Sequence, residues 1–471
     1  MSETHYYGAV INPQERNPRE PISYKVYPAC LIIVSPVGQI VDMIAQSDIV
    51  DFQEKERERC DEAVTVILSS DEFLMPGFID THTHAPQFPN LGIGQEYQLL
   101  DWLKDVTYPM EANFADPDFA ERTYRSVVRR IIDFGTTTCC YYGTVHLDAT
   151  KRLVDIVRDS GQRAFIGKCN MDREVPEDNL EPSANDSIQA TEQLIDYIQN
   201  LTQASDSLLI HPIITPRFAI SCTPELLRGL SDLAEAYNPT LHIQTHISEN
   251  LDEVARMGEL FPGNTSYADV YDSFGLLGRK TILAHAVHLG DDEIDIIAKK
   301  EAGISHCPTS NFNLTSGVAP VGKYLDAGIK IGLGTDVSGG FNPSILNAIR
   351  HASIASKVIS LQHNPSDPLK PGYNNRKLSV ATLLYLATLG GAQVCGLEDD
   401  IGSFALGKSF DALMVKVSSE AGNPGLYPGG KEDVDKYLRG MLERFLFCGD
   451  DRNISRVYVQ GKLIGGNDCI E

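Results

Sequence analysis

Two histidines one residue apart, His82 and His84, end a run of apolar and β-branched residues that begins near Pro76. Side chains at positions i and i+2 of a strand point to the same face, so the two imidazoles are expected to lie side by side. Imidazole nitrogens bind zinc and related transition metals. The pair therefore predicts two ligands of a metal site, provided that other parts of the chain supply the rest.

Three further side chains of the right type follow other short apolar runs. His246 ends the run 241–246, His285 ends the run 281–285, and Asp336 ends the run 330–336. Imidazole and carboxylate ligands that leave an open position for water suit zinc, although iron and manganese bind similar sets. One such residue is a weak signal, but the combination with the His-x-His pair is specific for a metal site.

The runs that carry these residues belong to a regular alternation of strand and helix patterns. Amphipathic helical patterns such as 120–134 and 291–301 separate short apolar runs. Eight strand–helix units predict a (β/α)₈ TIM-type barrel, in which polar side chains at the carboxyl ends of the strands share one rim. The alternative, a doubly wound open sheet, is disfavoured because no Gly-x-Gly-x-x-Gly turn follows an early strand. The eight runs are 78–84, 135–142, 163–170, 209–218, 241–246, 281–285, 304–308 and 330–336.

The two ends of the chain have a different pattern, with short strands and few helices. Strand patterns occur at 24–27 and 30–34, and again at 410–415 and 457–464. They predict one small composite β-sandwich domain built from both ends. We expect residues 1–75 and 395–471 to form this domain and residues 76–394 to form the catalytic barrel. The charged stretch 51–62 is typical of a solvated face or a surface helix.

The composition excludes several classes of function. The chain has 471 residues, a formal net charge of −24 and 42% hydrophobic residues. This acidic balance disfavours binding to a phosphate backbone, which usually needs a basic patch. No apolar run is long enough to span a bilayer, and the first twenty residues are polar and charged, so we expect a cytoplasmic protein. The ten cysteines form no Cys-x-x-Cys pair and are expected to be free, mostly buried thiols.

Six short motifs stand out along the chain: HAPQF at 84–88, LLDWL at 99–103, GTTT at 135–138, TPRF at 215–218, HISEN at 246–250 and GDDRNI at 449–454. Together they resemble the guanine deaminase branch of the amidohydrolase superfamily. The resemblance covers nearly the whole chain, including the split β domain. It implies hydrolytic deamination of guanine to xanthine and ammonia, and a homodimer.

The same resemblance implies how the metal is held. In this superfamily the ligands come from the first, fifth, sixth and eighth strands of the barrel. One zinc ion per chain is expected, because binuclear members carry a carboxylated lysine at the fourth strand and this strand ends in TPRF. His285 is expected beside the metal, and whether it is a ligand is left open. The implied ligands are His82, His84, His246 and Asp336.

The chemistry of deamination assigns the remaining roles. Free water is too weak a nucleophile to attack the aromatic ring, but zinc can lower the pKa of a bound water to about 7. Asp336 is placed to accept the proton of that water. Glu249, just past His246, is the expected carrier of protons to the ring nitrogen and to the leaving ammonia. His285 would hold the attacking oxygen from the other side.

Recognition of guanine needs donors for its O6 and N7 acceptors. Arg217 matches this edge with its bidentate fork, although a salt bridge at the rim is the alternative for this residue. Gln87 can donate and accept, and Phe218 offers an apolar face to the flat ring. Trp102, the only tryptophan, either forms a wall of the pocket or packs a helix.

Two other classes of function are alternatives to guanine deamination. A related aminohydrolase acting on another purine, a pterin or a triazine would keep the metal ligands but change Gln87, Arg217 and Phe218, all of which are present. A catalytically silent scaffold would be expected to lose a ligand or the proton carrier, and none is missing. His146, His242 and His288 are expected to be structural or loop residues.

Overall fold

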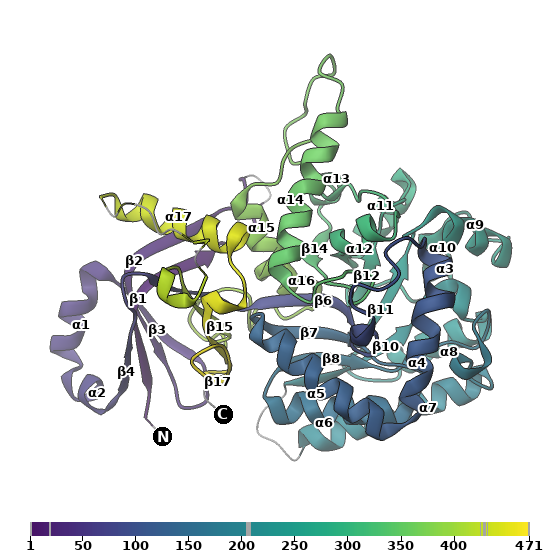
Figure 1. Cartoon of the computed structure of the whole chain (residues 1–471), viewed down its shortest axis with the longest axis horizontal. Helices are drawn as coiled ribbons and strands as arrows, with labels where there is room; N and C mark the ends of the chain where they lie inside the picture. Colours follow the sequence, from purple (N-terminus) through teal and green to yellow (C-terminus); the bar gives the residue numbers. More distant parts are fainter. Residues whose placement is uncertain are drawn as a thin grey trace.

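The computed structural model describes residues 2–17, 20–203, 209–423, 425–426, 430 and 432–469. Two sheets organise it, a closed parallel barrel and a mixed sheet (Figure 1). In Figure 1 the barrel lies on the right, and the mixed sheet lies on the left with both chain termini. The metal-site candidates all belong to the barrel.

The barrel confirms the predicted fold class. Each of the eight predicted runs overlaps a barrel strand, the run 163–170 covers β8 and its extension β9, and the pairings between neighbouring barrel strands are parallel. The ring closes where β14 pairs with β6, through Leu333 and Asp80. The strands are β6 (Phe78–His84), β7 (Thr136–Tyr142), β8 (Arg163–Gly167) with its short extension β9 (Cys169–Asn170), β10 (Ile210–Pro216), β11 (His242–Ile247), β12 (Thr281–His285), β13 (Gly303–His306) and β14 (Lys330–Leu333).

Helices surround the barrel and bury one face against it. In α5, the caps follow from the sequence, because the Asp116 side chain accepts from the N–H of Asp118 and Pro117 occupies the first helical position. The predicted helical patterns at 120–134 and 291–301 overlap α5 and α11, with ends that differ by up to three residues. The helices are α5 (Pro117–Asp133), α6 (Leu147–Ser160), α7 (Ala184–Gln203), α8 (Pro224–Glu235), α9 (Leu251–Leu260), α10 (Tyr267–Ser273), α11 (Asp291–Lys299), α12 (Pro308–Asn313), α13 (Val321–Asp326), α14 (Ile345–Gln362), α15 (Val380–Ala387) and α16 (Leu389–Val394).

The mixed sheet joins the two ends of the chain, as predicted. β15 pairs antiparallel with β5, which links the C-terminal strands to the N-terminal ones. The exact domain boundaries remain a prediction. The strands run in the order β17-β16-β15-β5-β1-β2-β3, with β4 beside β1, and comprise β1 (Thr4–Pro13), β2 (Tyr24–Val34), β3 (Ile40–Ala45), β4 (Val64–Ile67), β5 (Glu72–Pro76), β15 (Ala412–Lys416), β16 (Ile454–Val459) and β17 (Lys462–Gly465).

Two details of this sheet differ from the expectation. The segment 4–13, part of the stretch interpreted as polar, is the long strand β1, and the patterns at 24–27 and 30–34 belong to the single strand β2. The charged stretch carries the predicted surface helices, α1 (Ile49–Lys55) and α2 (Arg57–Glu62), while α17 (Val434–Cys448) precedes the last strands. All ten cysteines are free and most are buried, as expected. None of the described helices has the length and apolar character needed to cross a membrane.

The chain passes from the mixed sheet into the barrel at Gly77. This residue separates β5 from β6, and a Cβ atom placed on it would lie 2.2 Å from the side chain of Thr137. Only glycine fits such a close approach without a shift of the neighbouring strand. The tight junction fixes the start of β6, the strand that carries the His-x-His pair.

Candidate metal centre and active site

Four side chains from different barrel strands direct ligand atoms to one point at the carboxyl ends of the strands. One ligand atom from each of His82, His246, His285 and Asp336 lies within 4.8 Å of every other. His82 Nε2 and Asp336 Oδ1 are 3.1 Å apart. All four side chains are buried, at 9% exposure or less. The predicted strand ends therefore do converge on one cluster.

His84 lies directly against this cluster. Its Nε2 atom is 3.1 Å from Nε2 of His246 and 3.4 Å from Oδ1 of Asp336. The structure thus brings together all five residues that the sequence assigned to the metal or its immediate surroundings. The tighter group of four includes His285 in place of His84, so the geometry presents both histidines to the metal position.

The tautomers of two histidines follow from their outer contacts. Nδ1 of His246 donates to the backbone carbonyl oxygen of Arg217 at 2.6 Å, and Nδ1 of His285 donates to Oδ1 of Asn311 at 2.9 Å. In the neutral ring, Nε2 then carries the free lone pair that a metal needs. Burial lowers the pKa of His246 well below its usual value, which favours the neutral ring.

This donor set fits a divalent metal ion. The lone pairs of the imidazoles and a carboxylate face a common centre, and Nε2 of His285 is buried without a hydrogen-bond partner among the described residues. A buried polar atom without a partner is unfavourable unless a ligand satisfies it. Neutral imidazoles with an ionised carboxylate are the ligand types that zinc prefers.

The backbone is strained at the same place. Ser248, His285 and Asp336 follow or end barrel strands with φ angles of 47°, 72° and 46°, although none is glycine. Such left-handed conformations cost about 1–3 kcal/mol each and persist only where neighbouring bonds impose them. The N–H of Asp336 donates to the carbonyl oxygen of His82 at 2.9 Å, which is one of these bonds. The orientation of the ligands is therefore fixed by the backbone.

Asp80 holds the first and eighth strands together beneath the cluster. It is fully buried, and its Oδ1 accepts from the backbone N–H groups of His82 at 3.2 Å and Thr335 at 3.1 Å. Its Oδ2 accepts from Oγ1 of Thr335. Asp80 thus ties the strand of the His-x-His pair to the strand that precedes Asp336.

Two buried carboxyl groups at the cluster have opposite protonation tendencies. Burial, together with the nearby Asp336 charge, raises the pKa of Glu249 well above its usual value. Burial also opposes ionisation of Asp336, but its hydrogen bond to His82 and the nearby histidines outweigh this and hold its pKa well below the usual value. Such a pair supplies an acid and a base at the same pH.

Glu249 lies beside the cluster, outside the group of ligand atoms. Its Oε2 is 3.4 Å from Nε2 of His285, and its Oε1 accepts from Oγ of Ser316 at 3.3 Å. Backbone N–H groups of Glu249 and Asn250 donate to Oε2 of Glu253, which lies in the first turn of α9 and forms a capping box with Asn250. The carboxyl group of Glu249 is therefore positioned at the cavity by the start of that helix.

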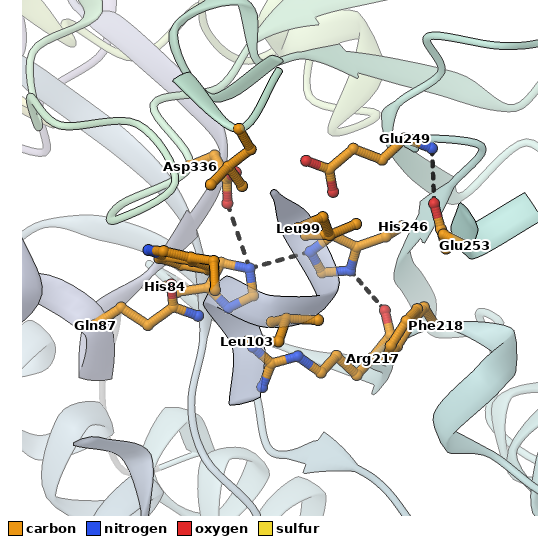
Figure 2. Close-up of a pocket in the computed structure, with 12 residues that line it drawn as sticks. His84, Gln87, Leu99, Leu103, Arg217, Phe218, His246, Glu249, Glu253 and Asp336 are labelled. Atoms are coloured by element: carbon orange, nitrogen blue, oxygen red, sulfur yellow. Dashed lines mark hydrogen bonds and ion pairs between the residues drawn. The ribbon is translucent and has the colours of Figure 1, made fainter. Parts of the chain in front are cut away.

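A cavity of about 380 Å³, measured with its opening, adjoins the cluster. In the view of Figure 2, Gln87 and Arg217 lie on the lower side, Asp336 and Glu249 lie on the upper side, and the rings of His84 and His246 lie between them. All four residues assigned to substrate binding from the sequence line this cavity. Its lining is His84, Gln87, Leu99, Trp102, Leu103, Arg217, Phe218, His246, Glu249, Glu253, Leu314 and Asp336.

A continuous helical segment covers the cavity, formed by α3 (Leu99–Trp102), η3 (Leu103–Thr107) and α4 (Tyr108–Ala112). Trp102 is 3% exposed and contributes to the cavity wall as well as to the packing of this segment. Trp102 therefore both lines the cavity and packs the helical segment, which were the two alternatives for this residue. Phe218 is also buried, with its ring centroid 6.5 Å from that of His246.

Arg217 lies at the cavity and also forms a buried ion pair. It lines the cavity, and its Nη1 donates to Oε2 of Glu111 at 2.6 Å in a fully buried ion pair. The sequence interpretation missed Glu111, as it missed Asn311 and Ser316. A single glutamate in a short helix carries no periodic or motif signal that would have indicated its partner.

Three further histidines, which the sequence interpretation assigned to structural or loop positions, lie outside the site. The ring of His242 packs 4.7 Å from that of Phe165, and burial lowers the pKa of His242 to about 3. His288 lies in the loop after β12, where its Nε2 bonds to the carbonyl oxygen of Ser316. His146 directly precedes α6. None of these three residues belongs to the metal cluster or the cavity lining.

Comparisons with known proteins agree with this geometry. A probable guanine deaminase of Schizosaccharomyces pombe is 48% identical over 399 residues, covering 84% of this chain and 72% of that protein. The guanine deaminase of Dictyostelium discoideum is 42% identical over 448 residues, covering 93% of this chain and 94% of that protein. Guanine deaminase from C. acetobutylicum, solved with guanine bound in the active site, has a TM-score of 0.84 at 34% identity and covers 98% of this chain and 100% of that one.

The model of the amidohydrolase family matches residues 73–464, which include the last strands of the mixed sheet as well as the whole barrel. The match therefore spans the metal cluster, the cavity and the junction between the two sheets. The chain belongs to the amidohydrolase family.

Proposed function

We propose that this protein is a guanine deaminase that hydrolyses guanine to xanthine and ammonia with the help of one zinc ion. The observation that carries the proposal is that one cavity joins the metal cluster to Gln87, Arg217 and Phe218. Relatives with 33–48% identity bear the name guanine deaminase or probable guanine deaminase. The cytoplasmic location and homodimeric state expected from the sequence form part of the same proposal.

The zinc ligands in this proposal are three histidines and one aspartate, with His285 adjacent. A bound zinc ion would supply Lewis acidity and lower the pKa of a water molecule to about 7. A single ion is supported because the fourth strand, β10, ends without a lysine that could hold a second metal. Lys168, which follows the third strand β8, is buried and donates to Glu181 and to the carbonyl oxygen of Cys169. The proposed ligands are His82, His84, His246 and Asp336.

The residues around the reacting carbon have complementary tasks. Asp336, held ionised by the histidines, accepts a proton from the attacking water as the oxygen adds to C2 of guanine. Glu249, whose raised pKa favours the protonated carboxyl group, donates its proton to the ring nitrogen N3. The Glu249 carboxylate then takes the remaining proton of the added hydroxyl group and delivers it to the amino group. The C2–N bond breaks as the C2=O bond forms, ammonia leaves, and the proton held by Asp336 returns to Glu249. His285 holds the attacking oxygen through Nε2, which faces Glu249 and Asp336.

Recognition uses the opposite side of the cavity. The guanidinium of Arg217 offers donors to O6 and N7 of guanine, and Gln87 offers a further donor and acceptor. Phe218 and Trp102 supply apolar surface for the flat ring. Adenine presents an amino group where guanine has O6, so its donor would face the Arg217 cation. Adenine also has no amino group at C2.

Steady-state release of ammonia from a panel of rings tests the proposal. The panel contains guanine, adenine, a pterin and an amino-triazine, each assayed with purified, zinc-loaded protein. We expect guanine to have the highest kcat/KM by a wide margin and to yield xanthine. Preferential deamination of another ring would reject guanine as the substrate while keeping the amidohydrolase chemistry.

A further inference from the structure

Glu111 is a buried carboxylate that contacts two of the proposed guanine-binding residues. It lies on α4, outside the barrel strands, and is 0% exposed. Its Oε1 accepts from Nε2 of Gln87 at 2.9 Å, and its Oε2 accepts from Nη1 of Arg217 at 2.6 Å. One carboxylate therefore connects two side chains that lie beyond the ends of different strands, β6 and β10.

This contact fixes the orientation of the Gln87 amide. Its Oε1 accepts from the backbone N–H of Ser338 at 3.1 Å, while its Nε2 donates to Glu111. A carboxylate cannot donate and a backbone N–H cannot accept, so a flipped amide would lose both bonds. Gln87 therefore presents one remaining N–H and one remaining lone pair in defined directions.

Glu111 also holds the guanidinium of Arg217. Among the described residues, this is the only hydrogen bond that the Arg217 side chain makes, and the guanidinium lies 5.3 Å from the ring centroid of Tyr108. The rest of its five N–H donors remain free for a ligand. Burial alone would lower the pKa of Arg217, but the Glu111 carboxylate outweighs it, so the pKa is raised and the group stays charged.

We propose that Glu111 is a positioning residue that sets selectivity for the O6 edge of the purine by holding Arg217 and Gln87. The inference rests on the proposed function. Glu111 acts through these two side chains and is absent from the cavity lining. An ion pair that only stabilised the fold would not have to link two residues of one cavity. A buried ion pair is also weak evidence for a contribution to stability. A displacement of about 1 Å in a binding group can cost about 10²-fold in rate.

The test compares two substrates in Glu111→Gln. Guanine and 2-aminopurine share the 2-amino group, but 2-aminopurine has no O6. The glutamine amide can accept from Gln87 or from Arg217 with its single oxygen, and it must turn its NH₂ toward the other. We expect kcat/KM for guanine to fall by at least about 10²-fold and kcat/KM for 2-aminopurine to fall far less. The ratio between the two substrates should therefore collapse.

A second variant guards against loss of folding. Glu111→Asp keeps the charge but is one methylene shorter, so it cannot hold both partners at their present distances. It should shift the substrate ratio in the same direction by a smaller factor. The matched control is Asp411→Asn, which breaks another buried ion pair, Arg163–Asp411 at 3.0 Å, between β8 and the start of β15. Asp411→Asn should lower Tm and leave the ratio unchanged.

A binding measurement gives the same comparison without turnover. Trp102 is the only tryptophan and lines the cavity, so its fluorescence reports xanthine binding. Affinity should fall in Glu111→Gln and be retained in Asp411→Asn. If the Glu111 variants lower Tm but keep both the substrate ratio and the xanthine affinity, Glu111 is structural and the inference is overturned. Wild-type protein that releases no ammonia from guanine would instead reject the proposed function itself.

Discussion

Replacement of Glu249 by glutamine separates proton transfer from metal binding and substrate binding. Glutamine keeps the length of the side chain and an oxygen that can accept from Ser316, but it cannot carry a proton. Burial and the Asp336 charge raise the pKa of Glu249 well above its usual value, which favours the protonated form of the native carboxyl group. Glu249→Gln therefore removes the proposed proton donor with little change in shape.

The expected loss follows from the proposed role. General acid–base catalysis contributes about 10²–10⁴-fold. At about 1.36 kcal/mol for each factor of ten, this is about 2.7–5.4 kcal/mol of transition-state stabilisation. We expect kcat for guanine to fall by at least about 10²-fold. Metal content should be unchanged, because Glu249 lies outside the group of ligand atoms and its nearest histidine contact is 3.4 Å.

The assay combines three readouts on the same preparation: xanthine formation, zinc content and xanthine binding followed by Trp102 fluorescence. The matched control is Glu253→Gln. Glu253 also lines the cavity, but its Oε2 accepts from the backbone N–H groups of Glu249 and Asn250, and an amide oxygen can accept in its place. Glu253→Gln should keep most of the activity. A Glu249→Gln variant with nearly normal kcat would refute the proton-carrier role, and loss of zinc would make Glu249 a ligand.

Three further variants test other parts of the site. Arg217→Met removes all donors of the guanidinium, so kcat/KM for guanine should fall by at least about 10²-fold, about 3 kcal/mol, with zinc content unchanged; nearly normal activity would reduce Arg217 to a partner in a structural ion pair. His246→Ala should lower zinc content, and full retention of zinc would remove His246 from the ligand set. Asp80→Ala leaves the N–H groups of His82 and Thr335 without an acceptor, so the free energy of unfolding should fall by roughly 1–3 kcal/mol, as measured by denaturant titration, and zinc should be lost more readily. Unchanged stability and zinc retention would show that Asp80 does not support the ligand strands.

The barrel was predictable because strand and helix patterns alternate along the chain. β12 was predicted with its observed bounds, 281–285, since its apolar run is short and ends in a polar residue. The run 304–308 was too long by two residues, because Pro308 begins α12 and cannot continue the strand. β1 was missed because its neighbours are polar, although Val10 and Ile11 are fully buried against the rest of the molecule. Whether such a segment forms a strand depends on its partner strand, which local composition does not reveal.

The cluster was predictable for a different reason. The carboxyl ends of barrel strands meet on one rim, so His82, His246, His285 and Asp336 converge even though up to 254 residues separate the partners of one contact. Glu111 was not predictable in this way. It lies on a helix beyond the strands, and its contact with Arg217 spans 106 positions. The left-handed backbone at the strand ends was also unforeseen, since non-glycine residues adopt it only where tertiary bonds impose it.

The central claim is that the cluster holds one zinc ion and that guanine hydrolysis depends on it. Titration of chelator-treated protein with zinc, with xanthine formation from guanine as the readout, tests this claim most directly. We predict that the stripped protein is inactive and that activity rises linearly and saturates at about one zinc per chain, the number expected for a site with one set of imidazole and carboxylate ligands. Full activity after complete removal of metal, or saturation only at two ions per chain, would contradict the account.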